Sequence, residues 1–556
     1  MPQRVLSYCT VLCLVLGLLL VPPTIAQSPT TISIRGPADQ IDKLLRRGRQ
    51  LESERRWGEA ISHYEGAVRR FPDDGKLQRR FELTRLHYDL SRRYADRSFC
   101  NAVATLPTGR ALDLYAGVLL KIDAHYVETP NWKTLVEHGT NNLEVALGER
   151  VFLDKNLPED RLALIDDFRR ELHRVLGPRV IATRQDARDA VETASTMAQR
   201  RLGIYPTAVV LEYLCGATNS LDVYSGYLTP DQLDEVYAQI EGNFVGLGIE
   251  LKAENNELLI VRVIPCSPAQ QAGMLSGDRI LSVDGQSTRD LSTDQAANLL
   301  HGKAGTIVRL VIARPAQESR ELTIQRRRVE VPSIDQAKII DRDYGIGYFR
   351  LVCFQKTTCR DLEEALWKLH REGMRGLIID LRGNPGGLLI TSVEAADKFV
   401  ERGVIVSTRG RSSQEDFTYS AHASGTWRVP LVVLIDQESA SAAEIFSGAI
   451  RDHRRGTIVG EQSYGKGSVQ GIFPLDMTRA GVRLTTARFY SPNGRPYSRS
   501  GVAPHVPVQL AAKPLDGHLA RRAKDSAMLD AAVQTARQLV QQQHAQNKRQ
   551  HTLLKK

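Results

Sequence analysis

One segment of the chain places a serine where acyl transfer could take place. Residues 436–444, DQESASAAE, follow the apolar run LVVLI, and small residues then turn the chain into a predicted helix. Free N–H groups and the dipole at a helix N-terminus favour negative charge, so an oxyanion could be stabilised beside Ser441. Taken alone, this segment is better explained by Ser439 and Ser441 capping the helix.

A lysine further along the chain shifts that balance. Lys466 lies between two glycines, in a loop that enters the strand-like run SVQGIF. A lysine held away from water has a lowered pKa and can act as a neutral base, so a Ser–Lys pair can do the work of Ser–His. The stretch GEQSYGK also fits a phosphate-binding loop. However, Gly467 stands where that loop needs Ser or Thr, and a strand follows instead of a helix.

A glycine-rich segment supplies the third part of the pattern. Residues 380–387, DLRGNPGG, follow the strand-like run GLIID. Glycines permit unusual backbone conformations and leave N–H groups bare, so this segment could complete an oxyanion hole or form a structural turn. The sequence contains neither G-x-S-x-G nor H-E-x-x-H, and its cysteines fit no zinc pattern. We therefore expect no metal and no cofactor.

The elements that must position these groups alternate between strand and helix from Gly345 onward. This alternation indicates an α/β core with a largely parallel sheet. Strands are predicted at 345–351, 376–381, 431–435, 457–459, 468–473 and 482–490, and helices at 360–371, 388–400 and 442–453. Before this core, β-like runs at 248–251, 258–263, 279–283 and 307–312, with a helix at about 294–300, predict a compact β domain.

The remaining regions are predicted to be helical. The segment 184–201 reads as one clear helix, and another is expected at about 526–541, before a basic, Gln-rich and mobile end. Residues 40–93 match a tetratricopeptide repeat at Gly48, Leu51, Ala60, Tyr64, Ala67 and Pro72. A stable array needs about three repeats and only one is evident, so a plain amphipathic hairpin is equally favoured.

The N-terminus has the pattern of an export signal. Arg4 precedes the apolar stretch from Val5 to Val21, and small residues allow cleavage after Ala26. An uncleaved membrane anchor is the alternative, because the apolar run is nearly long enough to span. We expect a periplasmic or extracellular protein, membrane-anchored if the signal stays. The net charge of +10 is spread along the chain, so nucleic acid is not an expected partner.

Seven cysteines are present, two of them in the export segment. The five that remain are an odd number, which leaves at least one unpaired in an oxidising compartment. We interpret them as mostly buried apolar residues, with Cys353–Cys359 as a weak disulfide candidate.

Together, DLRGNPGG, ESASAAEIFSGAIRD and GEQSYGKGSVQG resemble the carboxy-terminal processing, or tail-specific, serine proteases. The resemblance covers about residues 110–510 and includes LTTARFYSPNGRPYS. It implies an α/β protease core of the crotonase/Clp-protease type, an inserted PDZ β domain and a helical N-terminal region. The expected parts are 1–26 signal, 40–93 tetratricopeptide-like, 100–240 helical, 243–328 PDZ, 329–512 protease core and 513–556 C-terminal helix and tail.

Carried over residue by residue, the resemblance implies that Ser441 is the nucleophile and Lys466 its general base. The side chain of Gln470 would orient the lysine, and the backbone of Gly387 and Ala442 would form the oxyanion hole.

Two other positions are notable in the same comparison. Glu444 matches an acidic position that we interpret as structural. His505 replaces the Asp that the family usually has, away from the dyad.

The β domain resembles a PDZ module, in which successive N–H groups hold a C-terminal carboxylate and the peptide adds as a strand. The matching carboxylate-binding loop is Gly246, Leu247, Gly248 and Ile249, and residues 267–285 match the middle of the module. The implied function is endoproteolysis of unfolded or tail-exposed proteins near their C-termini, with the PDZ module delivering tails or plugging the site.

Other readings stay open. A catalytically idle PDZ/tetratricopeptide scaffold is the main alternative, and an acyl-CoA hydratase-like enzyme is a third. An adaptor protein binding the helical repeat and a homo-oligomer are also compatible with the sequence.

Overall fold

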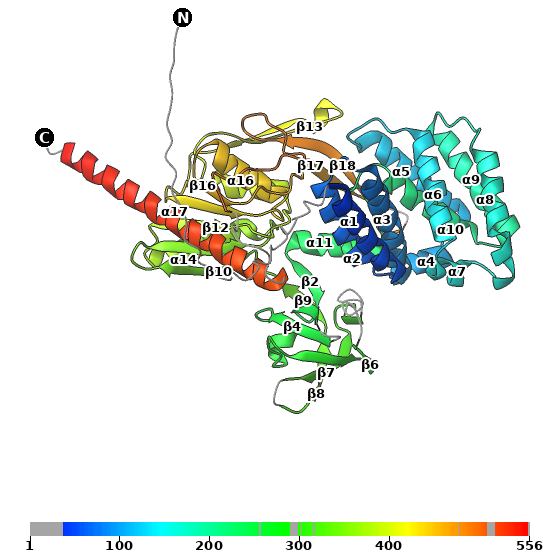
Figure 1. Cartoon of the computed structure of the whole chain (residues 1–556), viewed down its shortest axis with the longest axis horizontal. Helices are drawn as coiled ribbons and strands as arrows, with labels where there is room; N and C mark the ends of the chain where they lie inside the picture. The colour runs from blue at the N-terminus through cyan, green and yellow to red at the C-terminus, as the bar shows by residue number, and fades with distance from the viewer. Residues whose placement is uncertain are drawn as a thin grey trace, which may run out of the picture. The chain divides into compact units, whose positions relative to one another are not determined.

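The computed structural model describes residues 37–254, 257–289, 299–300, 302–314, 317–475, 478–508 and 517–553. The chain forms two compact units, Met1–Tyr88 and Asp89–Lys556 (Figure 1). The predicted export segment lies outside the described residues. No helix in the described ranges has the length and apolarity needed to span a membrane.

The first unit consists of packed helices. It contains α1 (Pro37–Ser53), α2 (Trp57–Arg70) and the start of α3 (Gly75–Ala95). Leu45, Ala67 and Leu77 pack around the buried ring of Tyr64. Any Cβ at Gly48 would overlap that ring, so the two helices pack closely at Gly48 and Tyr64. A tetratricopeptide identity for this unit stays a prediction.

The second unit begins with a helical region built around α10 (Pro206–Asn219), whose residues Pro206–Thr218 are all buried. The predicted helix at 184–201 is confirmed as α9 (Arg184–Leu202). A capping box between Thr183 and Asp186 begins it, and Gly203 with φ 74° ends it. The other helices are α4 (Arg97–Thr105), α5 (Thr108–His125), α6 (Trp132–Ala146), α7 (Arg150–Asn156), α8 (Ile165–Leu176) and α11 (Pro230–Glu241).

The β domain is an antiparallel sheet in the order β3-β4-β5-β7-β8, with β6 paired to β5. Its strands confirm the four predicted β runs, whereas most of the helix predicted at 294–300 lies outside the described residues. A separate pair, β2 with β9, joins the two ends of this domain. The elements are β2 (Asn243–Gly246), β3 (Ile249–Glu254), β4 (Glu257–Val263), α12 (Pro268–Gln271), β5 (Arg279–Val283), β6 (Gln286–Ser287), β7 (Ile307–Ala313), β8 (Arg320–Gln325) and β9 (Arg327–Glu330).

The α/β core has a six-stranded sheet in the order β10-β11-β12-β15-β16-β19. All neighbours from β11 to β19 are parallel, and only β10 is antiparallel. The largely parallel sheet predicted from the alternation is therefore confirmed. Its strands are β10 (Ile334–Asp341), β11 (Ile346–Leu351), β12 (Gly376–Asp380), β15 (Leu431–Ile435), β16 (Thr457–Gly460) and β19 (Val506–Pro507).

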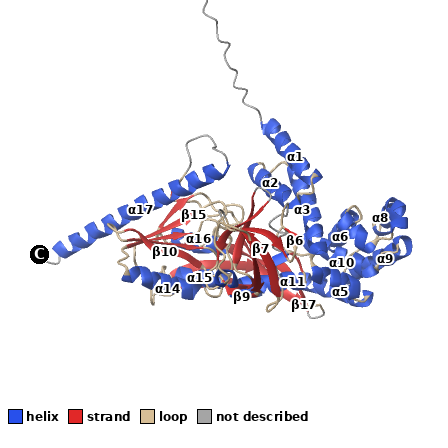
Figure 2. Cartoon of the chain, turned by 90° about the horizontal axis from the view of Figure 1, so that it is seen from below, coloured by secondary structure: helices blue, strands red, loops and turns tan. Residues whose placement is uncertain are grey.

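Helices cover both faces of this sheet because its strands are apolar on both sides. One face, which includes Leu377 and Val433, packs against α14 (Thr358–Arg371), α15 (Leu389–Asp397) and α16 (Ala442–Asp452). The alternate residues pack against α17 (Gly517–Leu553). Figure 2 shows α14 and α17 on opposite sides of the strands. The core is a three-layer α/β/α structure.

A second, antiparallel sheet connects the core with the helical region. It consists of β1 (Gly226–Leu228), β13 (Gly403–Gly410), β14 (Phe417–Ala421), β17 (Ser468–Leu475) and β18 (Ala480–Tyr490). The central strand, β18, pairs with β1, β13 and β17. It therefore joins strands that come from both sides of the β domain in the sequence.

Three expectations need correction. Cys353 and Cys359 are both free thiols, and the Cys359 sulfur lies 3.2 Å from Glu394 Oε2 on α15. Of the five cysteines, only Cys215 is buried. The C-terminal helix is also longer than the predicted 526–541, since the Gln-rich end consists largely of residues that sustain a helix.

Candidate active site

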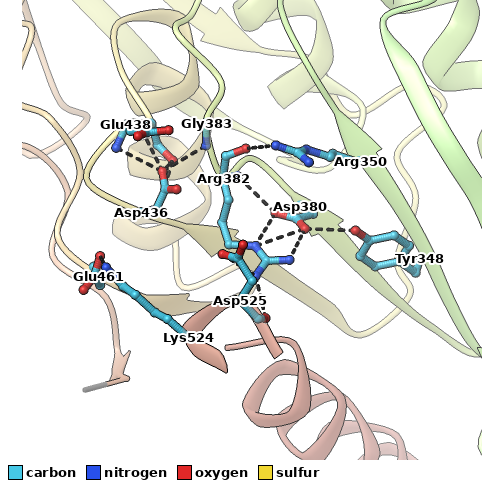
Figure 3. A network of polar contacts seen from close by, with 11 residues as sticks. Tyr348, Arg350, Asp380, Arg382, Gly383, Asp436, Glu438, Glu461, Lys524 and Asp525 are labelled. Carbon is cyan, nitrogen blue, oxygen red and sulfur yellow. Dashed lines mark hydrogen bonds and ion pairs between the residues drawn. The ribbon is translucent and has the colours of Figure 1, made fainter. Parts of the chain in front are cut away.

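Three loops at one edge of the parallel sheet carry the predicted core site residues Gly387, Ser441, Ala442 and Lys466, whereas Gln470 lies on β17. The loops follow β12, β15 and β16, and the carboxyl ends of parallel strands meet at the same edge. Asp436 joins the first two, because its Oδ1 accepts hydrogen bonds from Gly383 N and Ser439 N, each at 3.0 Å (Figure 3). Tyr464 N donates to Ser439 O at 2.9 Å and joins the third.

Ser441 stands at the start of α16 with φ 56°. A residue other than glycine persists at such a φ only where its surroundings fix it, and these residues are frequent at active sites. Gly386 presses against this turn: a Cβ there would come within 2.7 Å of Ser441 Cβ and 2.9 Å of Ala442 N. The glycine-rich loop and the serine turn therefore form one packed unit.

Two backbone amides lie close to Ser441. Gly387 N and Ala442 N have no hydrogen-bond acceptor within the described part of the chain. Gly387 has φ +138°, and a Cβ there would overlap the carbonyl oxygen of Phe354. Phe354 N donates to Gly386 O, and Leu388 N donates to Phe354 O, each at 2.8 Å. These bonds hold the Gly387 amide in a fixed position, as an oxyanion donor requires.

The carboxylate of Glu444 connects the serine turn with the lysine loop. Its Oε2 accepts from Ser441 N at 2.8 Å and from Lys466 N at 2.9 Å. Its Oε1 accepts from Ser463 Oγ at 2.6 Å and from Gly465 N at 2.7 Å. The pKa of Glu444 is raised, because the effect of burial exceeds that of these four hydrogen bonds, which lower it. The carboxylate thus fixes the backbone of both candidate catalytic residues.

The amine of Lys466 lies in a partly dehydrated position. Its Nζ is 4.8 Å from the centre of the Tyr224 ring. Burial, together with the positive charge of Arg483, lowers the pKa of Lys466 to about 8, against the opposing effect of the Glu444 and Asp222 carboxylates. A useful fraction of this amine is neutral near pH 7 to 8, which is what a general base requires.

Gln470 lies on β17, four residues after the lysine. Its Nε2 donates to Ser468 O at 3.1 Å and to Ser468 Oγ at 2.9 Å. Orientation of the Lys466 amine by Gln470 therefore stays a prediction.

Several residues around the lysine were missed by the sequence reasoning. Tyr224 and Asp222 come from the loop between α10 and β1, and Arg483 comes from β18. No local pattern could have identified them, because they are far from the lysine loop in the sequence. The second sheet brings them close to it in space.

The carboxylate-binding loop predicted in the β domain has a suitable backbone. The amides of Leu247 and Gly248 find no acceptor among the described residues. Their carbonyl oxygens accept from Ala269 N and Ile264 N, each at 2.9 Å. Gly248 has φ +83°, and a Cβ there would overlap Ser267. The two carbonyl hydrogen bonds fix the loop, which presents two N–H donors without an acceptor in the described ranges.

We expect Glu444→Gln to lower kcat about tenfold, and Glu444→Ala to lower it more. A carboxamide keeps one oxygen that can still bind the amides of Ser441 and Lys466, whereas alanine leaves all four donors without an acceptor. The measurement is kcat beside the melting temperature. A folded Glu444→Gln variant without activity would show that the carboxylate takes part in the chemistry.

Comparison with known proteins supports the resemblance to serine proteases that was found in the sequence motifs. Peptidase family S41 matches residues 345–508, and the PDZ domain family matches residues 259–314. The carboxy-terminal-processing protease of Bartonella bacilliformis is 38% identical over 300 residues, which are 53% of this chain and 68% of that protein. The carboxyl-terminal-processing protease of Synechocystis sp. is 36% identical over 292 residues, 51% of this chain and 67% of that protein.

Among solved structures, the photosystem II D1 C-terminal processing protease is 25% identical, with a TM-score of 0.38, over 74% of this chain and 97% of that one. The matched family, the identity to its curated members and the PDZ domain within the chain agree with the motifs quoted above. The chain belongs to the carboxy-terminal processing serine proteases of peptidase family S41.

Proposed function

We propose that this protein is an exported endopeptidase that cleaves other proteins near their C-termini through an acyl-enzyme on Ser441. Lys466 is the general base of this proposal. The observation that carries it is the shared carboxylate of Glu444, which binds the backbone N–H of both residues, at 2.8 and 2.9 Å. A merely structural helix cap would not need the lysine loop on the same carboxylate.

The chemistry follows from the groups in place. The neutral Nζ of Lys466 accepts the proton of Ser441 Oγ while that oxygen attacks the peptide carbonyl carbon. The negative charge on the carbonyl oxygen is stabilised by the free amides of Gly387 and Ala442. The lysine then gives its proton to the leaving amine. Water then attacks the acyl-enzyme. Lys466 accepts a proton from this water and returns it to Ser441 Oγ as the acyl group leaves.

The PDZ domain supplies the selection of C-termini in this proposal. A terminal carboxylate would accept from the free amides of Leu247 and Gly248, and the tail would add as a strand beside β3. Export rests on the N-terminal signal pattern, and the substrates would accordingly be exported proteins with unfolded tails.

The test compares unfolded reporter proteins that carry a free or an amidated C-terminus. Hydrogen bonds to a charged group contribute about 1.5–3 kcal/mol, so amidation should weaken capture about tenfold or more. Mass spectrometry of the products should place the cuts near the C-terminus of the free form. Equal rates for both forms would refute selection by the PDZ loop, and binding of tails without any cut would favour the idle scaffold.

A further inference from the structure

The C-terminal helix α17 reaches the edge of the sheet where the candidate catalytic loops lie. Met528, Ala532, Ala536 and Val540 form a buried stripe on the sheet face. Just before this stripe, two adjacent residues, Lys524 and Asp525, contact two different loops (Figure 3). The helix therefore does more than cover apolar strands.

The first contact is made with the glycine-rich loop. Arg382 Nη1 donates to the carbonyl oxygen of Asp525 at 2.7 Å, and the Asp525 carboxylate lies 3.6 Å from the same nitrogen. Arg382 also binds the buried carboxylate of Asp380 through Nε and Nη2. Its neighbour Gly383 donates to Asp436. The guanidinium thus ties α17 to the loop that ends in the free Gly387 amide.

The second contact is made with the lysine loop. Lys524 Nζ forms an ion pair with Glu461 Oε2 at 2.6 Å, and the Glu461 side chain is only 18% exposed. Glu461 directly follows β16 and begins the loop that ends in Lys466. Its backbone N donates to Ile435 O at 3.1 Å. The ion pair therefore acts at the start of this loop.

These two loops follow β12 and β16, which are separated in the sheet by β15. Lys524 and Asp525, which are adjacent on one helix, therefore contact two loops that are not neighbours in the sheet. Because catalytic groups lose effect when they are misplaced by about 1 Å, a fixed separation between the oxyanion amide and the base has a functional value.

We propose that α17 is a clasp, meaning a helix that fixes two loops of the candidate active site. Lys524 is the positioning residue for the lysine loop (Glu461–Lys466), and Asp525 is the positioning residue for the glycine-rich loop (380–387). This inference rests on the proposed roles of Ser441, Lys466 and Gly387. The C-terminal helix would then affect turnover, in addition to covering one face of the sheet.

The test is Lys524→Glu in the full chain, with Arg537→Glu as the matched control. Arg537 Nε forms an ion pair with Asp341 Oδ2 at 2.6 Å, on the same helix but at the hairpin between β10 and β11. We expect Lys524→Glu to lower kcat about tenfold with KM changed less than about twofold. Arg537→Glu should keep the wild-type kcat. The double variant Lys524→Glu/Glu461→Lys should regain most of the loss.

The pH profile separates positioning from mere stabilisation. The Lys466 amine faces Tyr224 and Asp222 from the loop before β1, Arg483 from β18 and Glu444 from α16. A loosened lysine loop lets water reach the amine, so its pKa rises and the acid limb of the rate profile moves to higher pH. This shift is expected for Lys524→Glu and not for Arg537→Glu.

Three outcomes would overturn the clasp. These are a wild-type kcat and acid limb in folded Lys524→Glu, equal losses in Lys524→Glu and Arg537→Glu, or no recovery in the double variant. Ser441→Ala, measured in the same series, identifies a different failure. If it stays active, the proposed dyad is wrong; if it is inactive, the result for Lys524→Glu concerns the clasp alone.

Discussion

Ser441→Ala should lower kcat by about five to six orders of magnitude while the protein stays folded. Loss of a serine nucleophile has an effect of this size because it removes the acyl-enzyme route as a whole. The substitution deletes only Oγ, and the hydrogen bond from residue 441 N to Glu444 is kept. Turnover of an unfolded reporter and the melting temperature are the two measurements.

Ser439→Ala is the matched control in the same turn. Ser439 is fully buried, and its Oγ donates to Leu381 O at 2.8 Å and lies 3.1 Å from Asp436 Oδ1. Its loss should lower stability by about 1–3 kcal/mol with a much smaller effect on turnover. If Ser441→Ala cleaved as fast as the wild type, or if Ser439→Ala were the inactive variant, Ser441 would not be the nucleophile.

Lys466→Arg should be almost inactive, with a loss of about a thousandfold or more. A guanidinium stays protonated at any useful pH, so it cannot accept the proton of Ser441. Lys466→Ala should be equally inactive, while Gln470→Ala should lose less, because Gln470 contacts Ser468. Activity is compared at saturating substrate. A Lys466→Arg enzyme with most of its activity would show that only a positive charge is needed here, and the dyad would have to be dropped.

The same mechanism fixes the sign of the wild-type pH dependence. The pKa of Lys466 is lowered to about 8, and the proposed mechanism requires the neutral amine. The rate constant kcat/KM should therefore rise with pH through about 8, and fall about tenfold for each pH unit below it. A rate that declined on raising the pH from 7 to 9 would contradict the assignment.

Much of the core could be predicted because its signals are local. The apolar runs at 431–435 and 376–381 have the length and position of buried parallel strands, and both are found as β15 and β12. Ser441 and the glycine-rich loop are adjacent in space because each follows such a strand at the same sheet edge. The pattern of strand, turn and helix was therefore sufficient to predict that these two segments lie close together.

The surroundings of the lysine could not be predicted in the same way. Tyr224 and Arg483 reach Lys466 through the second sheet, whose strands β1 and β18 lie on either side of the β domain in the sequence. The role of α17 was missed for a similar reason, since Lys524 and Asp525 look like ordinary surface charges in a helical pattern. Contacts of this kind depend on tertiary packing and leave no periodic signal.

The pairing of β2 with β9 has a consequence for how such chains can change in evolution. Val331 N donates to Gly242 O at 2.9 Å, so the PDZ domain leaves the rest of the chain and returns to it at one point. A domain whose two ends meet in this way can be lengthened, exchanged or deleted without rerouting the strands on either side. Relatives that share the protease core can therefore differ in the domain that they carry at this junction.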